Sequence, residues 1–395
     1  MFSNKDLRKL IIPLVIEQLL AVTIGMADTV MVSSCGEAAV SGISLVDSIN
    51  FLLITLFSSL ATGGAVIASQ YIGRGDHKSA SLAAKQLFYA SLALSAVLGI
   101  IAVFFRKPVL NMVFGSIEAD VMAHAQIYFL LSAISYPFLA VYNAGAALFR
   151  SMGDSRTTML ISILMNTINI VGNAILIYGF QMAAAGAATA SLVSRAVGAI
   201  IITVLLLNPH RIIFYDKLHK PEIHLSMLKS ILQIGVPNGL ENSIFQIGKI
   251  LVASIVSGFG TISITANAVA GNLASLQVIP GMALGMAMIT VVGQCIGAKD
   301  YEAVKKYTKK LMLITYGVVW AMTLLMLLFS KQILSFYSLS EETTTMTMEV
   351  FIVHGICAVI VWPLAFALPN ALRAANDAQQ RLFFLHLAAT HAHAH

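Results

Sequence analysis

Apolar residues follow one another in long stretches, and ten of these stretches reach the length that a helix needs to cross a membrane, about 20 residues. They lack the two-residue alternation of a membrane β-barrel. Backbone groups in lipid must be hydrogen-bonded within their own segment, which also favours helices. The pattern therefore predicts an all-α membrane protein. The predicted spans are 11–33, 44–70, 84–105, 121–148, 158–180, 183–207, 229–257, 264–294, 311–330 and 347–372.

The composition strengthens this interpretation and excludes other classes. Hydrophobic residues make up 58% of the 395 residues and charged residues only 11%, against roughly 25% charged residues in a typical soluble domain. A disordered chain, a coiled coil, a nucleic-acid-binding domain and an ordinary soluble enzyme are therefore excluded. The sequence has no HExxH, GxSxG, GKS or GKT motif, so we expect neither an enzyme nor an ATP-driven pump. No cofactor or metal centre is expected.

Basic residues are concentrated in alternate loops. One set of loops carries only Arg106, Lys107 and Lys331, whereas the N-terminus and the other loops carry all remaining Lys and Arg except Arg195 and Lys249. Positive loops face the cytoplasm, so both termini are predicted to be cytoplasmic in a multi-pass protein of the cell membrane. This bias accounts for the net charge of +6 without a nucleic-acid partner.

The chain repeats itself at a shift of 223 to 224 residues. The first copy contains six predicted spans, an even number, so the two copies enter the membrane from the same side and form a parallel repeat. Two such bundles are expected to face a central cavity. The matched positions are Pro13 with Pro237, Glu17 with Glu241, Gln70 with Gln294, Asp76 with Asp300, Arg150 with Arg373, and Asp154 with Asp377.

The repeat predicts the domain organisation. We expect an N-lobe of six helices at 1–208, a cytoplasmic linker at 209–224, a C-lobe of four helices at 225–378 and a non-homologous tail at 379–395. The second copy lacks a counterpart of 157–207, so we expect a chain truncated from a twelve-helix parent, and an inactive truncated product is one alternative for its function. The terminal HAHAH could bind a metal loosely, but without a second ligand cluster an unrelated tail is the better interpretation.

Several motifs resemble the multidrug and toxic compound extrusion (MATE) family of secondary transporters over about residues 5–378. The resemblance implies two six-helix lobes around a central cavity. It also implies export of small organic, often cationic, solutes by alternating access in exchange for Na⁺ or H⁺. A monomer in the lipid bilayer is expected. The motifs are PLVIEQLLAVTIGMADTVMVS at 13–33, QYIGRGDHKSA at 70–80, LFRSMGDSRTT at 148–158, NIVGNAILIYG at 169–179 and ITANAVAGNLASLQVIPGMALGMAMITVVGQCIGAKD at 264–300.

The resemblance points to a site for the coupling ion in the first half. Asp28 matches the central acidic residue of the family, and its carboxylate could ligate Na⁺ or carry a proton. Asn169 and Asn173 are four residues apart and share a helix face, and Ser191 matches a hydroxyl near this site. Some members have Asp where Asn173 stands, so the choice between Na⁺ and H⁺ remains open. The alternatives are a capped interfacial Asp28 and two Asn residues that only bond neighbouring helices.

Three further residues are candidates for the solute cavity. Glu17 and Glu241 each follow a proline by four residues, and two acids facing a cleft would attract a cationic solute. Alternatively, each Glu bonds the helix backbone or a basic side chain. Trp362 stands in a region where some members have an Asp, and it could form an aromatic wall for a flat cation or simply pack.

Three more charged residues lie within the predicted spans. Asp47 is predicted to cap the start of the second span, and Arg195 and Lys249 are predicted to pair with acids inside the membrane. The alternative function is a flippase for lipid-linked precursors of the same wider superfamily, against which the mainly acidic cavity candidates weigh.

Overall fold

The structure, a computed structural model, describes residues 2–115, 118–216, 218, 220, 222–335, 337 and 339–375. The predicted tail at 379–395 lies outside the described residues. The chain divides into two compact units, the first of which is Asn4–Gly239. The second begins at Leu240 and includes the residues that precede Asn4. The sequence repeat placed the boundary at a linker instead, and that assignment of lobes stays a prediction.

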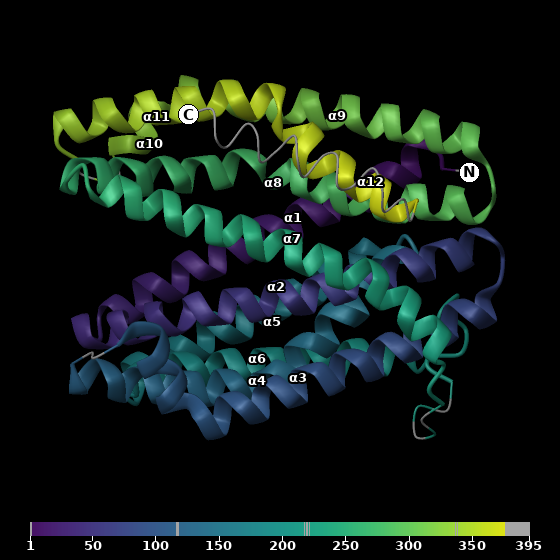
Figure 1. The fold of residues 1–395 in the computed structure, drawn as a ribbon, viewed down its shortest axis with the longest axis horizontal. Coiled ribbons are helices and arrows are strands. Elements are labelled where there is room, and N and C mark those ends of the chain that lie inside the picture. The colour runs from purple at the N-terminus through teal and green to yellow at the C-terminus, as the bar shows by residue number, and fades with distance from the viewer. Residues whose placement is uncertain are drawn as a thin grey trace. The chain divides into compact units, whose positions relative to one another are not determined.

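The first unit consists of long helices in chain order (Figure 1). The fourth of them, α4, packs against α2, α3 and α6, and α5 packs against α1 and α6. The helix α7 begins in this unit and continues into the second one. The elements are α1 (Asn4–Ser33), α2 (Glu37–Gly73), α3 (His77–Phe114), α4 (Ala119–Ser151), α5 (Ser155–Asn173), the π-helical turn η1 (Ala174–Gly179), α6 (Ala183–Leu206) and α7 (Leu225–Ser257).

The second unit continues with helices alone among its described residues. In it, α8 packs against α9, α11 and α12. Its elements are α8 (Thr261–Gly297), α9 (Tyr301–Leu328), α10 (Ser330–Ser335), α11 (Glu341–Ile360), the π-helical turn η2 (Pro363–Ala367) and α12 (Leu368–Ala374). Over the described residues of both units, ten helices are long and apolar enough to span a membrane. The prediction of an all-α chain with ten spans is therefore confirmed.

Aspartates cap the starts of three helices. The carboxylate of Asp76 accepts a hydrogen bond from the backbone N–H of Ser79 at 3.0 Å, and Asp300 does the same with Ala303 at 2.9 Å. Asp154 caps α5 in the same way. Each carboxylate satisfies a backbone donor that the first turn leaves free. Asp47, by contrast, lies inside α2, whose N-cap residue is Gly36, so its predicted capping role is wrong.

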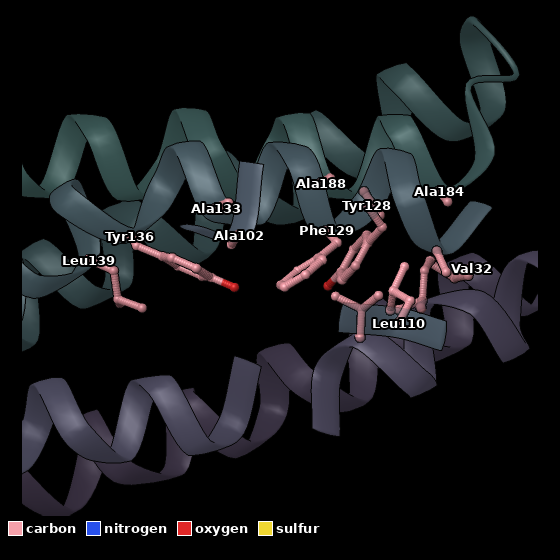
Figure 2. Close-up of a cluster of buried hydrophobic side chains, with 14 of the residues drawn as sticks. Val32, Ala102, Leu110, Tyr128, Phe129, Ala133, Tyr136, Leu139, Ala184 and Ala188 are labelled. Carbon is pink, nitrogen blue, oxygen red and sulfur yellow. The ribbon is translucent and has the colours of Figure 1, made fainter. Parts of the chain in front are cut away.

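A buried cluster built mainly from α2, α3, α4 and α6 forms a hydrophobic core in the first unit (Figure 2). Phe57, Phe129 and Tyr136 are almost completely buried. The hydroxyl of Tyr136 donates to the side-chain oxygen of Asn50 at 2.8 Å, and Tyr128 donates to Asp47 at 3.0 Å. Buried hydroxyls usually need such partners, so Asn50 and Asp47 allow two tyrosines to pack in an apolar core.

The segment after α6 packs on α3. The side chain of Gln86 donates to the carbonyl oxygen of Glu222 at 2.7 Å and accepts from the N–H of His224 at 3.0 Å. Tyr215 is buried against Phe88 at 5.3 Å between ring centroids, and this burial raises the pKa of its hydroxyl. The predicted linker, where it is described, is therefore anchored to the first unit.

Helices α2 and α7 approach each other closely at Gly63. A β-carbon at this position would lie 2.4 Å from the carbonyl oxygen of Ile231, which is too short for any real contact. We expect Gly63→Ala to lower the free energy of unfolding by about 1–3 kcal/mol, the usual cost of overpacking. Thermal unfolding in detergent measures this. Gly317→Ala is the control, because nothing lies within 4 Å of that position; equal melting temperatures for the two variants would contradict the close approach.

Candidate functional site

Asp28 and Asn173 meet where α1 packs against α5. Asp28 lies near the end of α1, and Asn173 is the last residue of α5. The side-chain N–H of Asn173 donates to a carboxylate oxygen of Asp28 at 2.5 Å. It also donates to the side-chain oxygen of Asn169 at 3.3 Å, and the amide of Asn169 donates to the hydroxyl of Ser191 in α6 at 3.0 Å. The structure therefore brings all four predicted coupling residues into one hydrogen-bonded chain.

This group, which we call the α1–α5 site, holds an oxygen atom that is poorly satisfied. Asn173 is fully buried and Asn169 is 2% exposed. Among the side chains that the structure describes, the side-chain oxygen of Asn173 has no hydrogen-bond partner, and such a buried acceptor costs about 1–3 kcal/mol. Carboxylate and carbonyl oxygens are the ligands that hard cations prefer. One carboxylate and neighbouring amide oxygens could therefore hold a monovalent cation.

A π-helical turn follows Asn173 directly. The turn η1 covers Ala174–Gly179, and such turns within α-helices are frequent at functional sites. Shortly after this turn, Gln181 and Ala183 have positive φ angles of 55° and 45°. Such angles are unusual for residues with a side chain. The sequence did not predict this turn, because no hydropathy pattern marks a single irregular turn inside an apolar stretch.

A second polar group lies near the α1–α5 site in the first unit. Asp47 accepts from Tyr128 and also from the amide of Asn50 at 3.1 Å. Asp28, Asp47 and Arg195 interact electrostatically. The guanidinium of Arg195 donates to the hydroxyl of Ser135 at 2.7 Å, and no carboxylate in the described chain lies within ion-pair distance of it. The predicted ion pair of Arg195 is therefore wrong.

Glu17 is neutralised by a neighbouring helix. Its carboxylate accepts from the guanidinium of Arg150 at 2.9 Å and from the hydroxyl of Thr158 at 2.8 Å. Glu17 is only 8% exposed. The pair therefore ties α1, one turn beyond Pro13, to the end of α4 and the start of α5.

Glu241 forms the equivalent pair in the second unit. Its carboxylate accepts from the guanidinium of Arg373 at 2.5 Å, and Arg373 also donates to the side-chain oxygen of Asn370 at 2.8 Å. Glu17 and Glu241, the two predicted cavity acids, are therefore each paired with a basic side chain, as the alternative interpretation expected. Their role in a solute cavity stays a prediction.

Trp362 belongs to a small aromatic group of the second unit. Its ring stacks on Phe366 with centroids 5.4 Å apart, and Phe366 meets the edge of Phe245 at 5.2 Å. The position of Gly281 leaves room for the indole. The role of Trp362 as an aromatic wall for a flat cation stays a prediction. Lys249 is exposed, and within the described part of the chain it forms no ion pair, contrary to expectation.

Comparisons with known proteins agree with this architecture. A family model described as MatE matches residues 13–175 and 237–393, and its second segment includes most of the predicted tail. The chain is 28% identical over 380 residues to the uncharacterized transporter YisQ of Bacillus subtilis, covering 93% of this chain and 81% of that protein. It is 29% identical over 310 residues to the probable multidrug resistance protein NorM of Thermotoga maritima, covering 76% and 65%.

A solved structure shares the fold. An outward-facing multidrug resistance MATE family transporter of the MOP superfamily superposes with a TM-score of 0.87 at 20% identity, covering 96% of this chain and 84% of the other. This likeness confirms the predicted all-α membrane fold. The names of these relatives describe transporters, in agreement with the prediction that the chain is not an enzyme.

Proposed function

The chain belongs to the MatE family, and on that premise we propose that it is a multi-pass membrane transporter that exports small organic compounds. Several of its relatives are named multidrug resistance proteins. Solutes of varied structure are therefore the substrates we propose, and organic cations are the class to test first. The proposed location is the cell membrane, with the N-terminus in the cytoplasm because of the basic loops and with a monomer as the working unit.

We further propose that export is coupled to inward Na⁺ at the α1–α5 site. The observation that supports this is the buried side-chain oxygen of Asn173 beside the carboxylate of Asp28, for which the described residues provide no hydrogen-bond partner. An amide oxygen can ligate Na⁺ but cannot carry a proton at neutral pH. Proton binding would require only the carboxylate of Asp28, whereas Na⁺ binding would also use the amide oxygens of Asn173 and Asn169 as ligands.

The site also suggests how the cation would act on the fold. Its ligands lie on α1 and α5, so a bound cation would hold the end of α1 against α5. The same helix contains Pro13, where the missing backbone N–H weakens the helix and allows it to bend. Cation binding would thereby reseat α1 and favour outward release of the solute, in an alternating-access cycle.

The direct test uses the full chain in proteoliposomes loaded with a fluorescent organic cation. We expect an inward Na⁺ gradient at constant pH to stimulate dye export, and a proton gradient without Na⁺ to have little effect. Stimulation by the proton gradient alone would overturn Na⁺ coupling while keeping the transporter. Dye export that ignores both gradients, or no export above that of empty vesicles, would count against the antiporter itself.

A further inference from the structure

Four basic residues surround a groove at the N-terminal end of α1. The groove has a volume of about 1030 Å³ and lies wholly within the first unit, between the first turns of α1 and the turn that joins α4 to α5. Its basic residues are Lys5, Arg8, Lys9 and Arg156. All four side chains are exposed. Both walls of the groove belong to the side of the membrane that the basic loops assign to the cytoplasm.

The positive charge of this groove is not compensated. Within the part of the chain that is described, none of its four cations forms an ion pair or a hydrogen bond. The groove contains one carboxylate, that of Asp154. It caps α5 by accepting from the N–H and the hydroxyl of Thr157 at 3.2 and 2.7 Å, and it pairs with Arg211 at 3.3 Å. Among the described residues that line the groove, no acid is therefore left to balance the four cations; Asp6, in the same turn of α1, is not part of that lining.

An apolar strip continues from the cations along the same face of α1. Lys5, Arg8, Lys9 and Ile12 are spaced three and four residues apart, the spacing of neighbours on one helix face. Ile12, Ile16 and Leu19 extend this face with 56%, 37% and 42% of their surface exposed. The opposite face, which contains Leu7, Leu10 and Leu14, is buried.

We propose that this groove binds the phosphodiester headgroup of an anionic phospholipid of the cytoplasmic leaflet, with an acyl chain along the apolar strip. Basic pockets between membrane helices on the cytoplasmic side suit such headgroups. A free phosphate would use the cations but would gain nothing from Ile12, Ile16 and Leu19. A lipid uses both parts of the surface, which is why we assign the groove to a lipid.

The test compares lipid retention by the full chain in native mass spectrometry. The protein is purified from nanodiscs that contain equal amounts of phosphatidylglycerol and phosphatidylcholine. The test variant is Arg8→Gln/Arg156→Gln, and the control Lys306→Gln/Lys309→Gln removes the same charge from the exposed first turns of α9, at the predicted cytoplasmic side of the second unit. One basic residue near an anionic membrane contributes about a fivefold gain in affinity. We therefore expect the test variant to bind phosphatidylglycerol roughly 30-fold more weakly and the control to match the wild type.

Two further measurements keep the result decisive. Arg8→Lys/Arg156→Lys should retain most of the lipid binding, which separates lost charge from a damaged fold. Soluble glycerol phosphate should not displace the lipid. The proposal fails if the wild type shows no preference for phosphatidylglycerol, if the control loses as much lipid as the test variant, or if glycerol phosphate competes fully. These outcomes are independent of the proposed transport function, because the assay involves no export.

Discussion

Asp28→Asn is expected to reduce Na⁺-driven export to the level of empty vesicles while leaving the protein folded. The substitution keeps the shape of the side chain and removes its negative charge. A cation bound beside the buried amides of Asn169 and Asn173 would then lack the carboxylate that balances it. Removing one partner of a buried charge pair costs about 3–5 kcal/mol, which corresponds to a loss of cation affinity of at least about a hundredfold. Export in proteoliposomes and Na⁺ titration of the purified protein measure the two effects.

Two asparagines on one helix provide a matched comparison. Asn173→Ala removes the unsatisfied oxygen but keeps the charge of Asp28, so we expect about a tenfold weaker Na⁺ dependence, since one ligand to a charged group contributes about 1.5–3 kcal/mol. Asn166→Ala is the control. Asn166 lies two turns earlier in α5 and donates to the carbonyl oxygen of Leu20 in α1 at 3.2 Å. If Asn166→Ala impaired Na⁺ dependence as much as Asn173→Ala, the assigned cation ligands would be wrong. Unchanged coupling in Asp28→Asn would refute the site altogether.

Arg150→Met is expected to cause the largest loss of stability, about 3–5 kcal/mol, because it leaves the carboxylate of Glu17 buried without a counter-charge. Glu17 is 8% exposed, so water cannot replace the lost partner. In the double variant Glu17→Leu/Arg150→Met the uncompensated charge is gone, and buried ion pairs replaced by apolar residues are often neutral in stability. We therefore expect the double variant to recover most of the loss. Thermal and denaturant unfolding in detergent, combined in a double-mutant cycle, give the coupling energy.

The second unit and an exposed ion pair supply the controls. Arg373→Met should resemble Arg150→Met, because Arg373 pairs with Glu241 in the same way. Lys305→Met should change stability by less than about 0.5 kcal/mol, because its pair with Glu302 is exposed and spans one helical turn. A double variant as unstable as Arg150→Met would show that the pair itself, rather than an orphaned charge, stabilises the fold.

Hydropathy predicted the ten spans but not the full lengths of their helices. The predicted span 44–70 belongs to a helix that begins at Glu37, and the span 84–105 belongs to one that begins at His77. At 37 and 38 residues these helices are longer than the roughly 20 residues that a membrane crossing needs, and their polar ends carry no apolar signal. This is also why Asp47 was interpreted as a cap: a lone charged residue near the end of an apolar stretch resembles a boundary. Its partner Tyr128 lies 81 positions away, beyond the reach of local patterns.

The predicted span 347–372 shows a different limit. The structure breaks this stretch into α11, the π-helical turn η2 and α12, with Pro363 at the start of the turn. The proline was visible in the sequence. Whether a membrane proline bends a helix or opens a turn depends on the packing around it, which hydropathy does not contain.

The candidate site was more predictable than the ion pairs. The four-residue spacing of Asn169 and Asn173 fixed their common face, and the resemblance to a family supplied Asp28 and Ser191. The partners of Glu17 and Glu241 were not predicted, although the repeat contained a clue. It matched the two acids with each other and, separately, Arg150 with Arg373. Two features that recur together at nearly the same offset are candidates for contact, even though the sequence does not show the distance between their helices.

The π-helical turn after Asn173 has an evolutionary consequence. Such a turn accommodates one extra residue without unravelling the helix on either side. The side chains up to Asn173 can therefore keep the angular register that directs amides toward the proposed cation site, while those after Gly179 follow a register set by their own neighbours. Substitutions before the turn can then tune ion selectivity, and substitutions after it can adapt the protein to a different bilayer. The two kinds of substitution can accumulate without disturbing one another.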